Sequence, residues 1–291
     1  RGFRADQSSL INGLTHERLT DPNLEKLVDS LLEDQKLLDQ DRKEVSIIKK
    51  DIQKSKKLNT EFVERMSKLT SEAYSVWEKA KLNSDFKLFL PSLASIVNML
   101  KEKCDLLGYE DHPYNALMDN FEEGMTVAKL DPLFEEVKIR LGSLINKVLS
   151  KQRSKTGFLS QKFELAKQQL LVKDILEFLQ VNKDLFRMDI SSHPFCTNFH
   201  SSDIRMTTRY NENDLMSSIW SAIHESGHGL YEMGLNRGII GLPSSNSVSL
   251  GIHESQSRFW ENNIGRSKVF IEAIFPLIQD IFPQQMAGLS P

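Results

Sequence analysis

The string HESGH at residues 224–228 carries the most chemical information in this chain. Residues four positions apart on an α-helix are neighbours on one face, with Cβ atoms about 5–6 Å apart, so His224 and His228 can both reach one metal ion. Glu225 projects from an adjacent face, where a carboxylate can act as general base on water beside the metal. The spacing therefore predicts a metal site with two imidazole ligands and Glu225 as the catalytic residue.

A hydrolytic zinc site needs a third protein ligand and one open position for water. Glu254 is the best candidate, because the Gly/Pro/Ser-containing string GIIGLPSSNSVSL lies between it and the motif and lets the chain reverse. An ordinary carboxylate at a helix start is the competing interpretation of Glu254. Glu232 and Glu261 are weaker candidates, and either could instead hydrogen-bond a ligand histidine and fix its tautomer.

The expected chemistry is hydrolysis of a peptide bond. Two neutral imidazoles and one carboxylate leave a divalent site with a charge of about +1, which lowers the pKa of a water ligand towards about 7. Glu225 would take the proton of that water and pass it to the leaving amine. His253 and the polar groups of DIRMTTRY at residues 203–210 are unranked candidates for stabilising the oxyanion.

The elements that must position these groups are mainly helices. Apolar residues recur every three or four positions through most of residues 21–180, with breaks expected near Pro91, at residues 108–113 and at Asp131–Pro132. Alternating polarity predicts a small β element at residues 185–210, before the helix that carries HESGH. A further helix is expected from about residue 250 to 265. The predicted fold class is mostly α, a long-helix zincin-like metallopeptidase fold, with a helical region at 1–182 and a metal-site region at 183–291.

Composition narrows the possible partners. The formal net charge is −3, without the clustered positive surface that binds phosphates, so no nucleic-acid partner is expected. The most apolar run, at residues 88–100, is short for a membrane helix and contains Pro91 and Asn98, so no membrane partner is expected. Two cysteines far apart in sequence, Cys104 and Cys196, are typical of free thiols in a reducing compartment, and we expect a cytoplasmic protein.

Three strings together resemble the thermostable carboxypeptidase family, also called the carboxypeptidase Taq family. They are HPF at 193–195, DIRMTTRY at 203–210, and IHESGHGLYE followed by HESQSRFWEN at 253–262. The resemblance covers nearly the whole chain. It implies a mostly helical homodimer that removes single residues from the C-termini of peptides, with broad preference but poor action at proline. It also implies zinc, often replaceable by cobalt or manganese.

The resemblance also implies roles for individual residues. The metal ligands would be His224, His228 and Glu254, with Glu225 as the base. The motif residues placed near the substrate cleft would be His193, Pro194, Phe195, Asp203, Arg205 and Thr207. The competing interpretation makes His193 and Asp203 hydrogen-bonding corner residues and Arg205 a buried ion-pair partner.

An exopeptidase must recognise the terminal carboxylate of its substrate, usually with arginine. Arg205, Arg209 and Arg258 are the candidates here. Two further motifs of the family, I-R-x-x-A-D and G-x-x-Q-D-x-H-W, do not occur in this sequence. We therefore expect an N-terminal portion with a complete metal site and an incomplete substrate site, which would be inactive as an isolated piece.

Two other functions stay open at this point. An oligopeptidase or endopeptidase would share the metal helix and the downstream glutamate, but it would still cleave a peptide with a blocked C-terminus. A helical interaction scaffold with a vestigial metal site would purify with substoichiometric metal.

Overall fold

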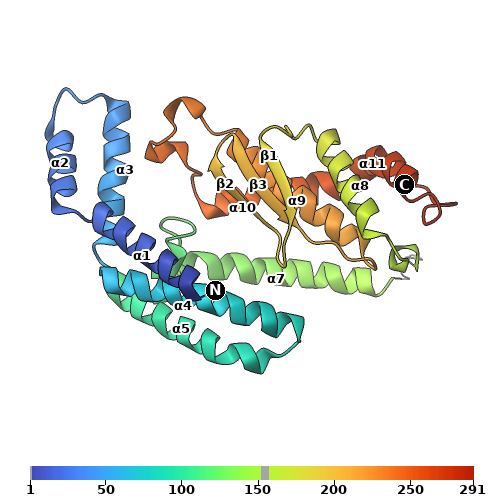
Figure 1. Ribbon diagram of the computed structural model, residues 1–291, viewed down its shortest axis with the longest axis horizontal. Helices are drawn as coiled ribbons and strands as arrows, with labels where there is room; N and C mark the ends of the chain where they lie inside the picture. The colour runs from blue at the N-terminus through green and yellow to red at the C-terminus, as the bar shows by residue number, and fades with distance from the viewer. Residues whose placement is uncertain (1, 152–156) are drawn as a thin grey trace. The chain divides into compact units, whose positions relative to one another are not determined.

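The computed structural model describes residues 2–151 and 157–291. Helices dominate the chain and one small sheet interrupts them, as predicted (Figure 1). Residues 152–156, which fall within the predicted helical stretch 21–180, lie outside the described residues. None of the helices in the described parts is long and apolar enough to cross a membrane.

Internal contacts divide the chain into two compact units. One consists of Arg1–Pro132 with the short segment Leu242–Ser244, and the other consists of Leu133–Gly241 with Ser245–Pro291. The boundary predicted at residues 182/183 followed the change from helical periodicity to alternating polarity, whereas this division follows contacts between residues. The predicted regions stay a prediction about domains.

The first unit is a set of packed helices. Helix α1 lies against α4, α4 against α5, and α2 against α3. Side chains begin several of them: Asp21 accepts a hydrogen bond from the Asn23 amide, and Asn59 accepts one from the Phe62 amide. Ser244 donates backbone and side-chain hydrogen bonds to the buried Glu44, which explains why its segment belongs to this unit. The helices are α1 (Gly2–Leu19), α2 (Pro22–Glu33), α3 (Asp39–Ser55), α4 (Thr60–Leu82), α5 (Phe86–Leu107) and α6 (Tyr114–Met118).

Two of the predicted helix breaks are wrong. Helix α5 continues through Pro91, and α7 (Val127–Leu149) continues through Pro132. Proline lacks the amide that bonds to the carbonyl four residues earlier, so its cost is smallest near the start of a helix. Each proline is the sixth residue of its helix, so one hydrogen bond is lost, to the carbonyl of Lys87 or of Ala128, and the helix continues beyond it. The predicted break at residues 108–113 is correct, since α5 ends at Leu107 and Gly108 adopts a φ of 73°.

The second unit contains the predicted β element, now resolved into three strands. These are β1 (Phe186–Ile190), β2 (Phe195–His200) and β3 (Asp203–Thr208). The order is β1-β3-β2, with β3 parallel to β1 and antiparallel to β2. Side chains on β3 alternate between two faces, and the fully buried Ile204 and Met206 share one of them.

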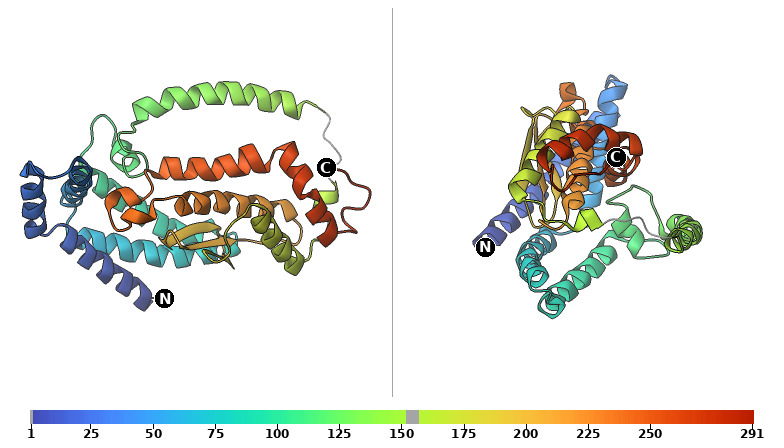
Figure 2. Two further views of the ribbon diagram at one scale, coloured as in Figure 1. Left: turned by 90° about the horizontal axis from the view of Figure 1, so that it is seen from above. Right: turned by 90° about the vertical axis from the view of Figure 1, so that its right-hand side faces the viewer.

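Helix α9 (Leu215–Met233) is the central element of this unit. One side of it contacts β2 and β3, and another contacts α10 (Leu250–Arg258) and the π-helical turn η4 (Phe259–Gly265), as Figure 2 shows. Its apolar residues form the hydrophobic core with α8 (Leu165–Phe178) and α11 (Lys268–Ile281). Core side chains that are fully buried are Phe163, Leu171, Ile175, Ile219, Ile223 and Ile274.

Two glycines allow α9 to approach its neighbours closely. A Cβ on Gly227 would lie 2.7 Å from Cα of Ser257 and 2.8 Å from the carbonyl oxygen of Gln256, both on α10. A Cβ on Gly229 would lie 2.3 Å from the ring of Phe186. The contact at Gly227 involves backbone atoms, which cannot rotate away. Gly227 therefore sets the separation of α9 and α10.

We expect Gly227→Ala to lower the free energy of unfolding by about 1–3 kcal/mol, because an added methyl forces packed backbones apart. Gly142→Ala in α7 is the matched control, since a Cβ there meets nothing within 4 Å. That control should be neutral or stabilising by up to about 1 kcal/mol, as usual for glycine replaced by alanine within a helix. Urea denaturation of both variants measures the difference. Equal stability of the two would contradict a close contact at Gly227.

Candidate metal centre

Three side chains from α9 and α10 converge as the sequence predicts. Oε2 of Glu254 lies 3.6 Å from Nε2 of His224 and 3.4 Å from Nε2 of His228. The three ligand atoms lie within 4.8 Å of one another. A tetrahedral zinc with bonds of about 2.0–2.2 Å separates its ligand atoms by about 3.3–3.5 Å. The donor set and its spacing therefore fit a divalent metal bound by two nitrogens and one oxygen.

Local structure holds Glu254 so that one oxygen faces the imidazoles. Ser249 caps the start of α10 by accepting a hydrogen bond from the Ile252 amide. The Arg258 Nε donates to Oε1 of Glu254 at 2.8 Å, and the Ser257 hydroxyl donates to Oε2 at 3.1 Å. Because Arg258 engages Oε1, the Oε2 atom is the one presented to a metal. Burial raises the pKa of Glu254, but the contacts with Arg258, His224 and Ser257 outweigh it and lower the pKa below its usual value.

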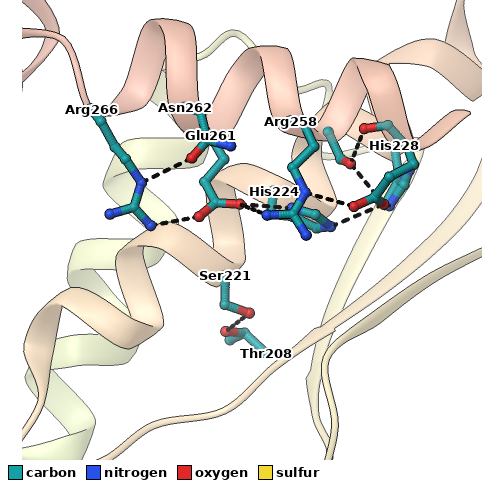
Figure 3. Close-up of polar contacts among 10 residues, drawn as sticks. Thr208, Ser221, His224, His228, Arg258, Glu261, Asn262 and Arg266 are labelled. Carbon is teal, nitrogen blue, oxygen red and sulfur yellow. Dashed lines mark hydrogen bonds and ion pairs between the residues drawn. The ribbon is translucent and has the colours of Figure 1, made fainter. Parts of the chain in front are cut away.

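Glu261 lies behind His224, on the side away from Glu254. Its Oε2 is 2.9 Å from Nδ1 of His224, and its Oε1 accepts a hydrogen bond from Arg266 at 2.6 Å (Figure 3). This is the arrangement that fixes a ligand histidine with Nδ1 protonated and the Nε2 lone pair directed at the metal. Burial raises the pKa of Glu261, yet the bonds to Arg266 and His224 lower it overall.

The π-helical turn η4 brings Arg266 beside Glu261. Residues five apart do not face each other on an α-helix, where neighbours are three or four apart. A π turn bonds residues five apart, and here the Arg266 amide donates to the Glu261 carbonyl at 3.1 Å. The Arg266 guanidinium also lies over the ring of Trp220 on α9. Sequence patterns did not predict this turn, because it has the apolar spacing of an ordinary helix.

Burial shifts the pKa values of His228 and Glu225 in opposite directions, and each shift favours the uncharged form. Burial, with further contributions from His253 and His224, lowers the pKa of His228 to about 4. A neutral imidazole is the form that binds a metal. Burial and the nearby Glu254 raise the pKa of Glu225 to about 7. A carboxylate with a pKa near neutrality is well suited to proton transfer at physiological pH.

Cys196 on β2 is a neighbour of the site that sequence reasoning did not place there. Its thiol has a pKa raised to about 12, by burial and by the negative fields of Glu225 and Glu232. It is a free cysteine, as is the buried Cys104. No spacing pattern links Cys196 to the HESGH string, so only the pairing of β2 with β3 under α9 reveals the proximity.

The HPF and DIRMTTRY strings meet at the sheet. The amide of Phe195 donates to the Thr207 hydroxyl at 3.0 Å, and Thr207 is buried. The side chain of Thr207 also hydrogen-bonds Ser191, whose hydroxyl donates to the His193 carbonyl. Thr207 thus fixes the loop that presents the largely exposed His193. A substrate contact from His193 stays a prediction.

Asp203 and Arg205 lie together on the outer face of β3. The guanidinium of Arg205 donates to both oxygens of Asp203, at 3.0 and 2.9 Å, and stacks on the ring of Phe199. Met206 faces α9, since its Sδ lies 3.3 Å from the position of a Cβ on Gly229. Strand alternation therefore directs Arg205 away from α9. This geometry favours the ion-pair interpretation, but the predicted burial of Arg205 is wrong, because its side chain is 47% exposed. A substrate role for either residue stays a prediction.

Two other candidates for substrate contact form ion pairs inside the site. Arg258 pairs with Glu254 and lies 3.8 Å from Glu261. Nε2 of His253 lies 2.7 Å from Glu232, so that nitrogen already has a partner. The third candidate for binding a terminal carboxylate, Arg209, is exposed.

A helix with HExxH spacing, a glutamate from the following helix and a small sheet along the metal helix define a zincin-like helical metallopeptidase. The chain belongs to the carboxypeptidase Taq (M32) metallopeptidase family, whose model matches residues 1–291. This family was predicted from the sequence strings, and the match confirms it.

Curated relatives and solved structures agree with that assignment. The chain is 38% identical to carboxypeptidase 1 of Bacillus subtilis over 273 residues, covering 93% of this chain and 54% of the relative. It is 36% identical to thermostable carboxypeptidase 1 of Pyrococcus furiosus, covering 93% and 55%. A crystal structure described as BsuCP matches with a TM-score of 0.96 at 36% identity, covering 99% of this chain and 59% of that one. The chain thus spans somewhat more than half the length of the curated relatives it matches.

Glu261→Gln should weaken metal binding by about tenfold, because the amide keeps a hydrogen-bonding group beside His224 but removes the negative charge behind it. Chelator competition with cobalt measures the dissociation constant. Glu272→Gln on α11 is the control, since the Glu272 side chain is half-exposed and its ion pair within the described part of the chain is with Lys268, at 3.5 Å. An unchanged dissociation constant for Glu261→Gln would contradict this role.

In the metal-free protein, Glu225→Gln should stabilise the fold more at pH 8 than at pH 5. The pKa of Glu225 is about 7 when folded and about 4.3 in an unfolded chain, so the folded state holds its proton more tightly. The stability that Glu225 contributes is complete below about pH 4 and is lost as pH rises through about 7. Glutamine does not titrate, so its advantage should grow by about 2–3 kcal/mol between pH 5 and 8. Urea unfolding at both values measures it, and a pH-independent difference would contradict the raised pKa.

Proposed function

We propose that this protein is a zinc-dependent carboxypeptidase that releases single C-terminal residues from peptides with broad specificity. The convergence of His224, His228 and Glu254 on one point carries the proposal. Family membership supports exopeptidase over endopeptidase activity. Cobalt or manganese could replace zinc, because imidazole and carboxylate ligands suit all three metals to different degrees.

The proposed mechanism assigns one task to each of the four residues. A divalent metal, when bound, polarises the scissile carbonyl and acidifies a water molecule. His224 and His228 hold it as neutral imidazoles, and Glu254 supplies the single negative charge of the ligand set. Glu225 accepts the proton of the attacking water and returns it to the leaving amine. Without a metal, burial and the nearby Glu254 raise its pKa to about 7. A bound divalent cation would lower that pKa and favour the carboxylate that accepts the proton.

The three arginines that could bind the substrate's carboxylate are either ion-paired or exposed. Arg258 and Arg205 are paired with acidic residues, and Arg209 is exposed. A free terminal carboxylate would therefore have to compete with Glu254 or Asp203 for the first two. The homodimer implied by the family resemblance and the cytoplasmic location predicted from the two cysteines also remain proposals, which sedimentation and fractionation would test.

Glu225→Gln should abolish proton transfer and leave the metal in place. We expect kcat on an N-blocked dipeptide to fall by about 10²–10⁴-fold, with the cobalt dissociation constant within about threefold of wild type. The measurement uses the protein in its complete form, with chelator-treated wild type as the negative control and Glu272→Gln as the unaffected variant.

The same assay separates the alternatives. Cleavage of a C-terminally amidated peptide at an internal bond would replace the carboxypeptidase proposal with an endopeptidase. If the wild-type protein contains no bound metal and shows no hydrolysis that a chelator inhibits, it is a non-catalytic helical protein. Hydrolysis that survives Glu225→Gln would contradict the assignment of the base.

A further inference from the structure

The two imidazoles of the metal centre are held in different ways. His224 is fixed through Nδ1 by the carboxylate of Glu261. Nδ1 of His228 is buried and has no hydrogen-bond partner among the described residues. The backbone of His253 interacts with this imidazole and raises the pKa of His228. Its position relative to Nδ1 nevertheless falls outside hydrogen-bond geometry. A ligand histidine almost always donates its second nitrogen to an acceptor, so the orientation of the His228 ring needs another source.

The ring of His253 provides that source. It stacks on His228 with centroids 4.5 Å apart and an angle of 23° between the planes. The ring of Tyr231 meets His253 edge-on at 5.4 Å, and the Tyr231 hydroxyl accepts a hydrogen bond from the Val248 amide. His253 therefore lies between two aromatic rings that both belong to α9.

A buried carboxylate fixes His253 in that place. Nε2 of His253 is 2.7 Å from Oε1 of Glu232, and the Glu232 side chain is 8% exposed. The other oxygen of Glu232 accepts a hydrogen bond from the side-chain amide of Asn198 on β2. Buried carboxylates are costly unless they are paired, so this chain of contacts resists rearrangement. It connects the sheet, α9 and α10 at the back of the metal centre.

We propose that His253 is a positioning residue whose ring, packed between His228 and Tyr231, sets the ring plane of His228 in place of the missing hydrogen bond. The inference rests on the proposed function, in that His228 is a metal ligand. It assigns His253 no contact with substrate, because its Nε2 is engaged by Glu232. Stacking fixes a plane but adds little charge, so this device orients His228, whereas Glu261 both orients His224 and increases its basicity.

Three variants separate orientation by the ring from simple packing. His253→Ala removes the ring. His253→Phe keeps a ring but leaves the Glu232 carboxylate with Asn198 as its remaining partner among the described residues. The double variant Glu232→Gln with His253→Phe removes that unpaired charge and keeps an acceptor for Asn198. The readouts are the cobalt dissociation constant, by chelator competition, and the visible absorption spectrum of the cobalt-loaded protein, which reports coordination geometry. Thermal unfolding of the metal-free proteins shows that each variant is folded.

We expect His253→Ala to raise the cobalt dissociation constant by about 10–100-fold and to alter the spectrum, which is the usual effect of losing a group that orients a ligand. The double variant should stay within about threefold of wild type with an unchanged spectrum. Wild-type affinity and spectrum in His253→Ala would overturn the proposal. So would a double variant that is folded but binds cobalt as weakly as His253→Ala. Should His253→Ala fail to fold, the double variant alone decides.

These outcomes are distinct from failure of the proposed function. A wild-type protein that binds no cobalt overturns both. A wild-type protein that binds cobalt and loses hydrolysis on Glu225→Gln, combined with unaltered metal binding in His253→Ala, overturns the role of His253 alone.

Discussion

The separation of α9 and α10 is the constraint on which the metal centre depends. Two ligands lie on one helix and the third on the other, so their geometry is only as accurate as the packing between the two backbones. Gly227 sits inside the HESGH string and permits that packing, because no other residue leaves the space occupied by Ser257 and the Gln256 carbonyl. The motif thus contains its own spacing device, between the base and the second ligand. Core packing of α9 against α8 and α11 on its other side holds the helix in this position.

The carboxylates around the centre differ in burial and in electrostatic environment, and the difference matches their proposed tasks. Glu254 and Glu261 each receive a hydrogen bond from an arginine, and their pKa values are lowered despite burial. Such groups stay ionised and suit a ligand and a partner of a ligand. Glu225 is buried more deeply and is repelled by Glu254, so its pKa rises to about 7. Glu225 on α9 can therefore gain or lose a proton near neutral pH, whereas the neighbouring Glu254 and Glu261 stay ionised.

Sequence reasoning predicted the parts of this site that depend on local periodicity. The i, i+4 spacing of His224 and His228 and the reversing loop before Glu254 were sufficient to predict their convergence. The roles of Glu232 and Glu261 stayed open, because both follow from tertiary contacts: one pairs with His253 and the other with His224. Pro91 and Pro132 were misjudged because a proline signals a break without indicating how far along the helix it lies. The orientation of Arg205 was accessible, since alternation with the apolar Ile204 and Met206 places it on the outer face.

Because of the π-helical turn at Phe259–Gly265, the pairing of Arg266 with Glu261 depends on the number of residues in this segment. An α-helix advances about 100° per residue, so deletion of a single residue there would rebuild a regular helix and swing Arg266 out of register with Glu261. The core contacts of α11 would be displaced by the same rotation. Homologous chains that preserve the charge pair should consequently tolerate substitutions in this segment far better than insertions or deletions.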